Sequence, residues 1–584
     1  MLNTRRKPLI GAVILLTSLG VTTSCIDNSY DLDKDIDMTI SVGGEHLAFP
    51  VGNTEKITLD KIIEVNAGDD LQVLENGEYH LLKQDDIDQT TTTVEVVEVK
   101  GSTNEISEIG VVNESSFPTT ANIETDEIRS TGTIDTKATG IDKAVIEIGG
   151  LTAKTNTNLD IQFLLSGELA YNTATIKKMV ITFPAFLQFK EGQDGLKGNT
   201  YTIENRQIDK SNGLTIQLHV TGYLFGTKSG EGKTVIEENG DRIISIENEE
   251  IEVKTVVEVK GIDLNKQASL SINPTAILAP MAVAEVSGTI KPEMNVDPTE
   301  VELSNLPDFL QDDDVKLDIT NPIFSFNANN PLNTDIEMDG VMTGYKNGKV
   351  TKSVKIGSGN GGNPIILKPS GQEKQTISLT RISTTIAGAT TVVVPNLNDL
   401  IETIPDRIKV ELEPSVKTND YYTVGLGKSY ILDSEYNIDI PLNFGEHLTI
   451  VYKDSIDDLN SDLEDIDFKK AVIAITADNT IPLQLEIKPD NVTPKDLNGN
   501  KIADIKVTVA GTIAESDGKA VSTSQLTITL EETKEGAVSK LEELVFKVTA
   551  VPGQATNVQL RSDQWMQLKD MKLKVPNGIK IDLN

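Results

Sequence analysis

The sequence contains one cysteine, Cys25, in 584 residues. A single cysteine cannot form a disulfide within the chain, and it cannot supply a zinc site ligated by several cysteines. Stability must therefore come from the burial of apolar surface. The 560 residues from Cys25 onward are enough for about three or four domains of ordinary size.

Aromatic residues and histidines are also scarce. Phe, Trp and Tyr make up 4% of the chain, and Trp565 is the only tryptophan, so few rings are available to stack on sugars. The four histidines, for which surface positions are expected, lie far apart at His46, His80, His219 and His447. No HExxH metal motif and no GxSxG nucleophile motif occurs. We therefore expect no enzyme and no bound metal or cofactor.

Positive charge is in short supply. The chain has 53 Lys and Arg residues against 89 Asp and Glu residues, and residues 1–24 hold three of the basic residues and no acid. The chain from Cys25 onward therefore carries a net charge of −39. Such a charge repels nucleic acid and anionic lipid surfaces, so neither is expected as a partner. It also makes any pair of carboxylates uninformative as a sign of hydrolase activity.

The only long apolar run lies at the start of the chain. Pro8–Val21 follows a basic segment at positions 5–7 and is shorter than the roughly 20 residues that span a bilayer, but it suits a signal peptide. Small residues then lead into Cys25. This pattern predicts a lipoprotein signal peptide over residues 1–24, cleavage before Cys25, and acyl chains on Cys25 that anchor the protein to a membrane. An ordinary signal peptide with an incidental cysteine is the alternative.

An acidic stretch follows the cysteine. Its aspartates alternate, so in an extended chain they share one face: Asp31, Asp33, Asp35 and Asp37. A row of carboxylates is a weak candidate for calcium, which needs six to eight oxygen ligands. The favoured interpretation is a solvated tether over residues 25–40.

The rest of the chain has the pattern of β-strands. Thr93–Lys100, Leu214–Val220 and Ile251–Lys260 are rich in β-branched residues that mostly alternate with polar ones. Seven Asn-Gly pairs punctuate the chain and favour type I′ hairpin turns. We therefore predict an all-β fold of tandem antiparallel β-sandwich modules of the Ig-like type, with very little helix.

Recurring strand motifs and proline-containing edges suggest where the modules lie. We expect an N-terminal β region over residues 41–300, made of two modules. A middle β-sandwich is expected over residues 301–420, and a C-terminal β-sandwich over residues 421–584.

Two short motifs could carry chemistry. Gly226–Thr234 (GTKSGEGKT) is similar to a phosphate-binding loop, but its glycine spacing is wrong and it lies between strands rather than before a helix, so we interpret it as a hairpin loop. Asp454-Ser455-Ile456 matches a short O-glycosylation sequon and makes Ser455 a possible acceptor.

Four blocks of the chain carry a family resemblance. They are the cysteine followed by YDLDKDID at 30–37, LPDFLQDDD at 306–314, the NPIFSF and NNPLN segments within 321–333, and QLKDMKLKVPNGIKIDLN at 567–584. In these blocks the chain resembles large lipoproteins of the Bacteroidota that have no assigned function. The resemblance implies an outer-membrane location and a modular β architecture, and no site residues. An acidic run directly after the cysteine marks surface export in that group. Here Ile26 and Asn28 interrupt it, so a surface-facing position is favoured and a periplasmic one stays open.

These features together favour a cell-envelope lipoprotein with a non-enzymatic interaction or structural role. Its expected partners are the membrane, through the lipid, and other envelope proteins or glycans. A glycan-binding accessory of a polysaccharide-uptake system is the first alternative, and it requires Trp565 or several tyrosines on an exposed face. An extracytoplasmic hydrolase is the remote alternative and requires a perturbed acid–base pair.

Overall fold

The structure is a computed structural model that describes residues 40–42, 48–63, 65–113, 120–167, 173–263, 265, 269–304, 306–307, 310, 314–456 and 466–581. Cys25 and the four alternating aspartates lie outside these residues, as does His46. The predictions that concern them therefore remain predictions.

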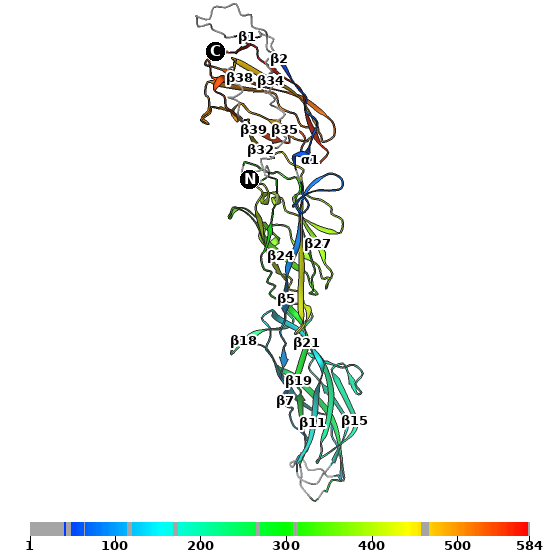
Figure 1. The fold of residues 1–584 in the computed structure, drawn as a ribbon. Coiled ribbons are helices and arrows are strands. Elements are labelled where there is room, and N and C mark those ends of the chain that lie inside the picture. Colours follow the sequence, from blue (N-terminus) through cyan, green and yellow to red (C-terminus); the bar gives the residue numbers. More distant parts are fainter. Residues whose placement is uncertain are drawn as a thin grey trace, which may run out of the picture.

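The described residues are nearly all β, which confirms the predicted fold class. They form 41 strands and one α-helix of four residues, α1 (Leu59–Ile62). The strands gather into three β-sandwich modules that follow one another along an elongated molecule (Figure 1). We call them the first, middle and last modules.

The first module lies at one end of the molecule, where Figure 1 labels β7, β11 and β15. One layer contains β10, β12, β15 and β19, the other contains β11, β16, β20 and β21, and β6 pairs with both β10 and β21. Its strands are β6 (Glu98–Val99), β7 (Ser102–Glu105), β8 (Ile109–Val112), β9 (Asn122–Glu124), β10 (Ile128–Thr139), β11 (Val145–Gly167), β12 (Thr173–Thr182), β13 (Leu187–Phe189), β14 (Leu196–Lys197), β15 (Thr200–Asp209), β16 (Leu214–Leu224), β17 (Lys233–Thr234), β18 (Ile236–Glu238), β19 (Asp241–Lys260), β20 (Leu270–Leu278), β21 (Met281–Ile290) and β30 (Tyr422–Gly425).

The middle module pairs a six-stranded sheet, in the order β28-β27-β23-β31-β5-β4, with a five-stranded sheet built on β22-β29-β24-β25. Its strands are β4 (Leu71–Val73), β5 (Tyr79–Thr93), β22 (Thr299–Glu302), β23 (Ile323–Ala328), β24 (Ile336–Lys346), β25 (Lys349–Ile356), β26 (Ile365–Leu367), β27 (Gln375–Thr380), β28 (Ala389–Val393), β29 (Arg407–Ser415) and β31 (Ser429–Pro441). Two 3-10 helices accompany them, η2 (Ser358–Asn360) and η3 (Leu397–Leu400).

The last module lies at the opposite end, where Figure 1 labels β1, β2, β34 and β38. Its main sheet has the order β2-β40-β34-β38-β37, and two smaller sheets are built on β39 and β41. Its strands are β1 (Ile40–Val42), β2 (Ala48–Gly52), β3 (Ile57–Thr58), β32 (Ile450–Ile456), β33 (Ile466–Asp467), β34 (Lys470–Asn479), β35 (Gln484–Glu486), β36 (Val492–Lys495), β37 (Ile505–Ala510), β38 (Ser522–Glu532), β39 (Glu543–Val551), β40 (Trp565–Lys574) and β41 (Ile579–Ile581). The 3-10 helices η4 (Pro489–Asn491) and η5 (Val538–Lys540) complete it.

The sheets differ from the expected module boundaries in three places. β4 and β5, which were expected in the N-terminal region, belong to a sheet of the middle module. β1 and β2, which were expected in the N-terminal region, pair with β41 and β40 of the last module. β30 and β31, which were expected in the C-terminal sandwich, pair with β21 of the first module and with β5 and β23 of the middle module. Boundaries drawn along the chain cannot anticipate pairings between strands hundreds of residues apart.

The modules share one hydrophobic core. Alternating residues of the long strands point inward, as in β20, where every second side chain is buried. Most of the buried apolar residues form one continuous cluster that extends from Leu59 in α1 to Met571 in β40 and includes residues of all three modules. A second, smaller cluster around Val538 lies within the last module. Apolar contacts therefore continue across both module junctions.

The expected turns are confirmed in part. At Asn239-Gly240 and at Asn347-Gly348 both residues have positive φ and join paired strands directly, as a type I′ turn requires. In the other Asn-Gly pairs only the glycine has positive φ, so they are different turns. The predicted strands at 214–220 and 251–260 lie within β16 and β19, whereas Thr93–Lys100 is broken between β5 and β6.

Candidate functional site at the module junctions

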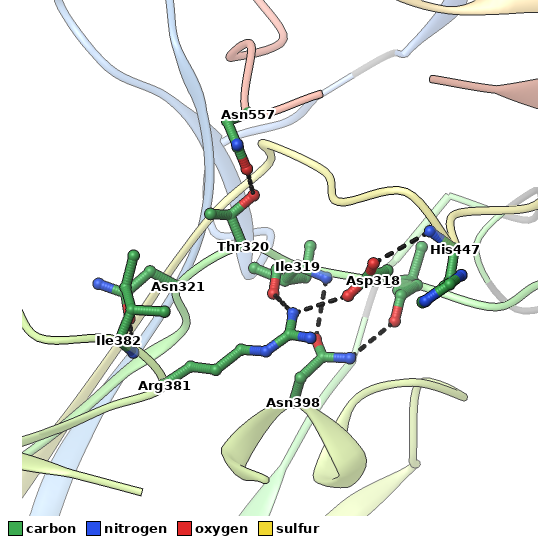
Figure 2. A network of polar contacts seen from close by, with 10 residues as sticks. Asp318, Ile319, Thr320, Asn321, Arg381, Ile382, Asn398, His447 and Asn557 are labelled. Carbon is green, nitrogen blue, oxygen red and sulfur yellow. Dashed lines mark hydrogen bonds and ion pairs between the residues drawn. The ribbon is translucent and has the colours of Figure 1, made fainter. Parts of the chain in front are cut away.

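The polar network of Figure 2 lies where the middle module meets the last one, and we call this place the second junction. Its centre is Asp318, whose side chain is only 10% exposed. The Arg381 guanidinium donates to the Asp318 carboxylate at 2.6 Å, and the backbone amide of His447 donates to it at 3.0 Å. The buried charge is therefore balanced by a cation and by an amide dipole.

These hydrogen bonds hold Asp318 in its charged form. Burial alone would raise its pKa, but the His447 amide and the Arg381 guanidinium outweigh burial and hold the pKa of Asp318 below its usual value. Arg381 also donates to the carbonyl of Ile319 at 2.5 Å. One guanidinium thus joins the carboxylate to the backbone of the next residue (Figure 2).

Asn398 and Gly445 complete the second junction through hydrogen bonds to the backbone of residues 317–319. Asn398, in η3, accepts from the Ile319 amide at 2.9 Å and donates to the Leu317 carbonyl at 3.0 Å. Gly445 donates its amide to the Asp318 carbonyl at 2.6 Å, and a Cβ at position 445 would overlap the Asp318 carboxylate. This close approach explains why a glycine is found there.

The last module contacts this network through the segment before β40. Asn557 accepts a hydrogen bond from the Thr320 hydroxyl at 2.7 Å, and its amide donates to the Phe444 carbonyl at 2.8 Å. Further along, the Tyr79 amide at the start of β5 donates to the Leu560 carbonyl at 3.1 Å. The junction therefore joins the two modules by side-chain and backbone hydrogen bonds together.

His80 adds a titratable group at this junction. It is buried, which corrects the expectation of a surface histidine. Its Nδ1 lies 2.5 Å from the Asp439 carboxylate, and its Nε2 lies 3.6 Å from Glu78, whose backbone bridges to Arg561 of the last module. Burial by itself lowers the pKa of His80, but the two carboxylates outweigh burial and raise it above 6.5.

The raised pKa predicts a pH dependence of stability. A group whose pKa is higher in the folded state stabilises the fold fully below its unfolded pKa, near 6.5, and this contribution is lost as the pH rises through the folded pKa. The stability that His80 contributes, measured as the difference in urea midpoint between the natural protein and His80→Gln, should be larger at pH 6 than at pH 9. An equal or larger difference at pH 9 would contradict this assignment.

The first junction lies between the first and middle modules and involves the glycine-rich loop 226–234. Glu147, in β11, accepts from the amides of Gly230 and Gly232 at 3.0 and 2.9 Å, and the Gly232 amide also reaches the Tyr421 hydroxyl at 2.9 Å. Glu231 accepts from the amides at positions 227 and 228. The amides that could cradle a phosphate are thus occupied by the chain's own carboxylates.

Tyr421 fits between glycines at this junction. It directly precedes β30, the strand that pairs with β21, and a Cβ on Gly149 or Gly232 would overlap its side chain. Burial and the Glu147 carboxylate raise the pKa of Tyr421 to about 12. Burial would raise the pKa of Glu147, but hydrogen bonds from Tyr421 and the two glycine amides lower it. The loop therefore clamps the chain segment that leads from β29 of the middle module into β30 of the first module.

Gly149→Val should weaken this clamp because the new side chain would meet the Tyr421 ring. Overpacking of this kind costs about 1–3 kcal/mol of unfolding free energy. Gly110→Val is the matched control, since Gly110 also lies in a strand of the first module, has no positive φ, and has open space where a Cβ would lie, with no atom within 4 Å. Urea unfolding should separate the two variants, and equal midpoints would contradict the clamp.

Ser455, the predicted glycosylation residue, lies in β32, which pairs with β39 within the described sheets. It is half-buried, and its hydroxyl hydrogen-bonds Glu543.

Glycosylation of Ser455 stays a prediction. The natural protein should carry a hexose-containing mass increment that Ser455→Ala removes, and an intact mass equal to that of the lipidated polypeptide would contradict it.

The aromatic residues do not form an exposed platform. Trp565 is half-buried, and the Lys56 ammonium lies 3.7 Å from its ring centroid, so one ring face is covered. In the described part of the chain every tyrosine is buried or half-buried. This arrangement does not favour stacking on a glycan.

The remaining predicted groups are dispersed. His219 is half-buried, with its Nδ1 3.0 Å from Asn158, and His447 contributes its backbone to the second junction. Over the described ranges no group of three or more His, Cys, Asp and Glu side chains is placed to hold a metal ion. Within the same ranges, no helix has the length and apolar character needed to cross a membrane.

The described part of the chain is thus built from tandem antiparallel β-sandwich modules. No family model matches the sequence, and no curated protein matches it. Among solved structures, a candidate secreted protein from Parabacteroides distasonis is 14% identical, with a TM-score of 0.35 over 50% of this chain and 83% of that one. A protein of the infectious bursal disease virus particle is 8% identical, with a TM-score of 0.15 over 83% and 78% of the two chains. The Faustovirus major capsid protein is 9% identical, with a TM-score of 0.12 over 72% and 92%. Scores this low do not bear on function.

Proposed function

We propose that the chain is a lipid-anchored protein of the outer membrane, facing the cell surface, that acts without catalysis. Its modules form a stiff stalk that holds the first module away from the membrane for contact with other envelope components. The acyl chains on Cys25 supply the attachment, and the junctions supply the stiffness.

The position of β1 is the observation that carries this proposal. β1 begins at Ile40 and pairs with β41 in the last module, at the end of the molecule opposite the first module (Figure 1). Cys25 is 15 residues earlier, a span of about 50 Å at most. A membrane attached through Cys25 would therefore lie near the last module.

The middle module supports the separation of the two ends. β5 has 15 residues and pairs with β31 over almost its whole length, and a strand of that length spans about 50 Å. The hydrogen bonds around Asp318 and Asn557 join the middle module to the last module, and Tyr421 fixes the segment that leads from the middle module into the first module. A stalk joined in this way would keep the first module at a defined distance from the lipid.

Energy transfer to labelled lipids tests the orientation. Acylation consumes the only natural cysteine, so an introduced cysteine gives one labelling site. Asn577 lies in the exposed turn beside β41, and Asn212 lies in the exposed turn after β15, at the far end of the first module. In vesicles with acceptor lipids, a donor on Asn577→Cys should transfer energy efficiently and a donor on Asn212→Cys weakly. Equal or reversed efficiencies would contradict the proposal.

A further inference from the structure

The outer face of the main sheet in the last module carries an unusual pattern of charge. Three lysines on it, Lys572 and Lys574 of β40 and Lys506 of β37, are exposed and form no ion pair with the described residues. We call these three residues and the surface between them the lysine face. Figure 1 places its sheet at the end of the molecule where β1 and β2 lie.

Strand register shows that the lysine face is continuous. Lys574 is opposite Val472, which is opposite Thr529, which is opposite Thr508. Since directly paired residues point to the same side of a sheet, these rows share one face. The two rows that contain Lys574 and Lys572 otherwise carry uncharged outward residues: Val472, Ala474, Thr508, Ala510, Thr527 and Thr529. The row of Lys506 continues through Glu531 to Lys470 on the same face.

Two of the acids beside this surface are neutralised within the sheet. Glu531 forms an ion pair with Lys470 at 3.7 Å. Asp478 is bonded to Lys569 and accepts from the Thr523 hydroxyl at 2.7 Å. Two further acids near it, Asp504 and Asp570, are exposed and have no ion pair with the described residues. The three free ammonium groups of the lysine face therefore exceed the free carboxylates beside it by one.

The last module also differs from the others in net charge. Residues 48–63 and 466–581 together contain 17 basic and 17 acidic residues, so their net charge is zero. Residues 94–290, which make up most of the first module, contain 17 basic and 28 acidic residues. Five further acids lie in 457–465, outside the described residues. The repulsion expected between an acidic protein and an anionic surface is therefore weaker for the last module than for the first.

We infer that the lysine face is a docking surface for the anionic headgroups of the membrane that anchors the protein. The inference rests on the proposed function, because a Cys25 anchor at most 15 residues from β1 would bring lipid to this end of the molecule. The three lysines lie at the end of this sheet away from the second junction, so their ammonium groups can approach headgroups while the modules extend away from the membrane. The attraction of each lysine to an anionic surface falls off within a Debye length of about 10 Å at 0.1 M salt, so it is strongest where the ammonium groups lie close to the headgroups.

Vesicle cosedimentation tests the lysine face without the lipid anchor. The full mature chain with Cys25→Ala should pellet with vesicles of phosphatidylglycerol and phosphatidylcholine at low salt, and much less with phosphatidylcholine alone. The triple variant K506Q/K572Q/K574Q should bind the anionic vesicles more weakly by roughly tenfold or more. Raising the salt to 0.5 M should abolish the difference.

A matched control separates position from total charge. Lys349, Lys352 and Lys355 are exposed on β25 in the acidic middle module, so K349Q/K352Q/K355Q makes the same change of charge elsewhere. This control should bind within twofold of the parent chain. Three results would overturn the inference. They are equal losses in the two triple variants, no binding of vesicles by the parent chain, and binding of soluble heparin without binding of vesicles. Because the chain tested has no acyl group, such a result would leave the Cys25 anchor standing.

Discussion

Replacing Cys25 with alanine is expected to move the protein from the membrane fraction to the soluble fraction and to abolish its labelling with fatty acid. Each buried methylene of an acyl chain contributes about 0.8 kcal/mol, and two or more chains are needed for stable attachment. No second cysteine exists to take over the modification. The three lysines of the lysine face are too few to replace acyl chains at physiological salt.

Ser24→Ala is the matched control for this substitution. It replaces the residue directly before the cysteine with another small residue, which keeps the predicted cleavage site intact, so processing and labelling should both persist. Fatty-acid labelling that survives Cys25→Ala would contradict the anchor, and so would membrane retention of that variant after a high-salt wash.

Arg381→Ala is expected to give the largest loss of folding stability among single substitutions at the junctions. It removes the cation beside the buried Asp318 carboxylate and a donor to the Ile319 carbonyl. Breaking a buried ion pair by removing one partner costs about 3–5 kcal/mol because the other charge stays buried, and the partial exposure of Arg381 favours the lower end of that range. The lowered pKa of Asp318 should rise toward its usual value in the variant.

Arg407→Ala is the control. Arg407 donates to Glu300 at 2.6 Å, but both side chains are more than a third exposed, and surface pairs of this kind contribute about 1 kcal/mol or less. Urea unfolding followed by circular dichroism should rank the two variants, and exchange of the Ile319 amide should quicken in Arg381→Ala alone. Equal midpoints would contradict a central role for the Asp318 network.

Local pattern predicted much of the β architecture. The alternation in Ile251–Lys260 depends only on neighbours in sequence, and the structure places that segment inside β19. The type I′ turns at Asn239-Gly240 and Asn347-Gly348 are local for the same reason. The prediction of one strand over Thr93–Lys100 was wrong. Val94 and Val97 are buried, but they lie between β5 and β6 rather than in a strand.

The junctions could not be predicted from sequence. Asp318 is one of 89 acidic residues, and its partners Arg381, Asn398 and His447 reach it only through the register of distant strands. The loop at 226–234 matched a phosphate cradle in composition, while its actual partner, Glu147, lies some 80 residues earlier in β11. Its two closely spaced glycines were the only signal in the sequence.

The mass of the amino-terminal peptide from the native membrane-extracted protein tests the central claim most directly. The account predicts that this peptide begins at Cys25 and carries the mass of a diacylglyceryl group, with or without a further amide-linked acyl chain. An amino terminus at any other residue, or an unmodified Cys25, would contradict it.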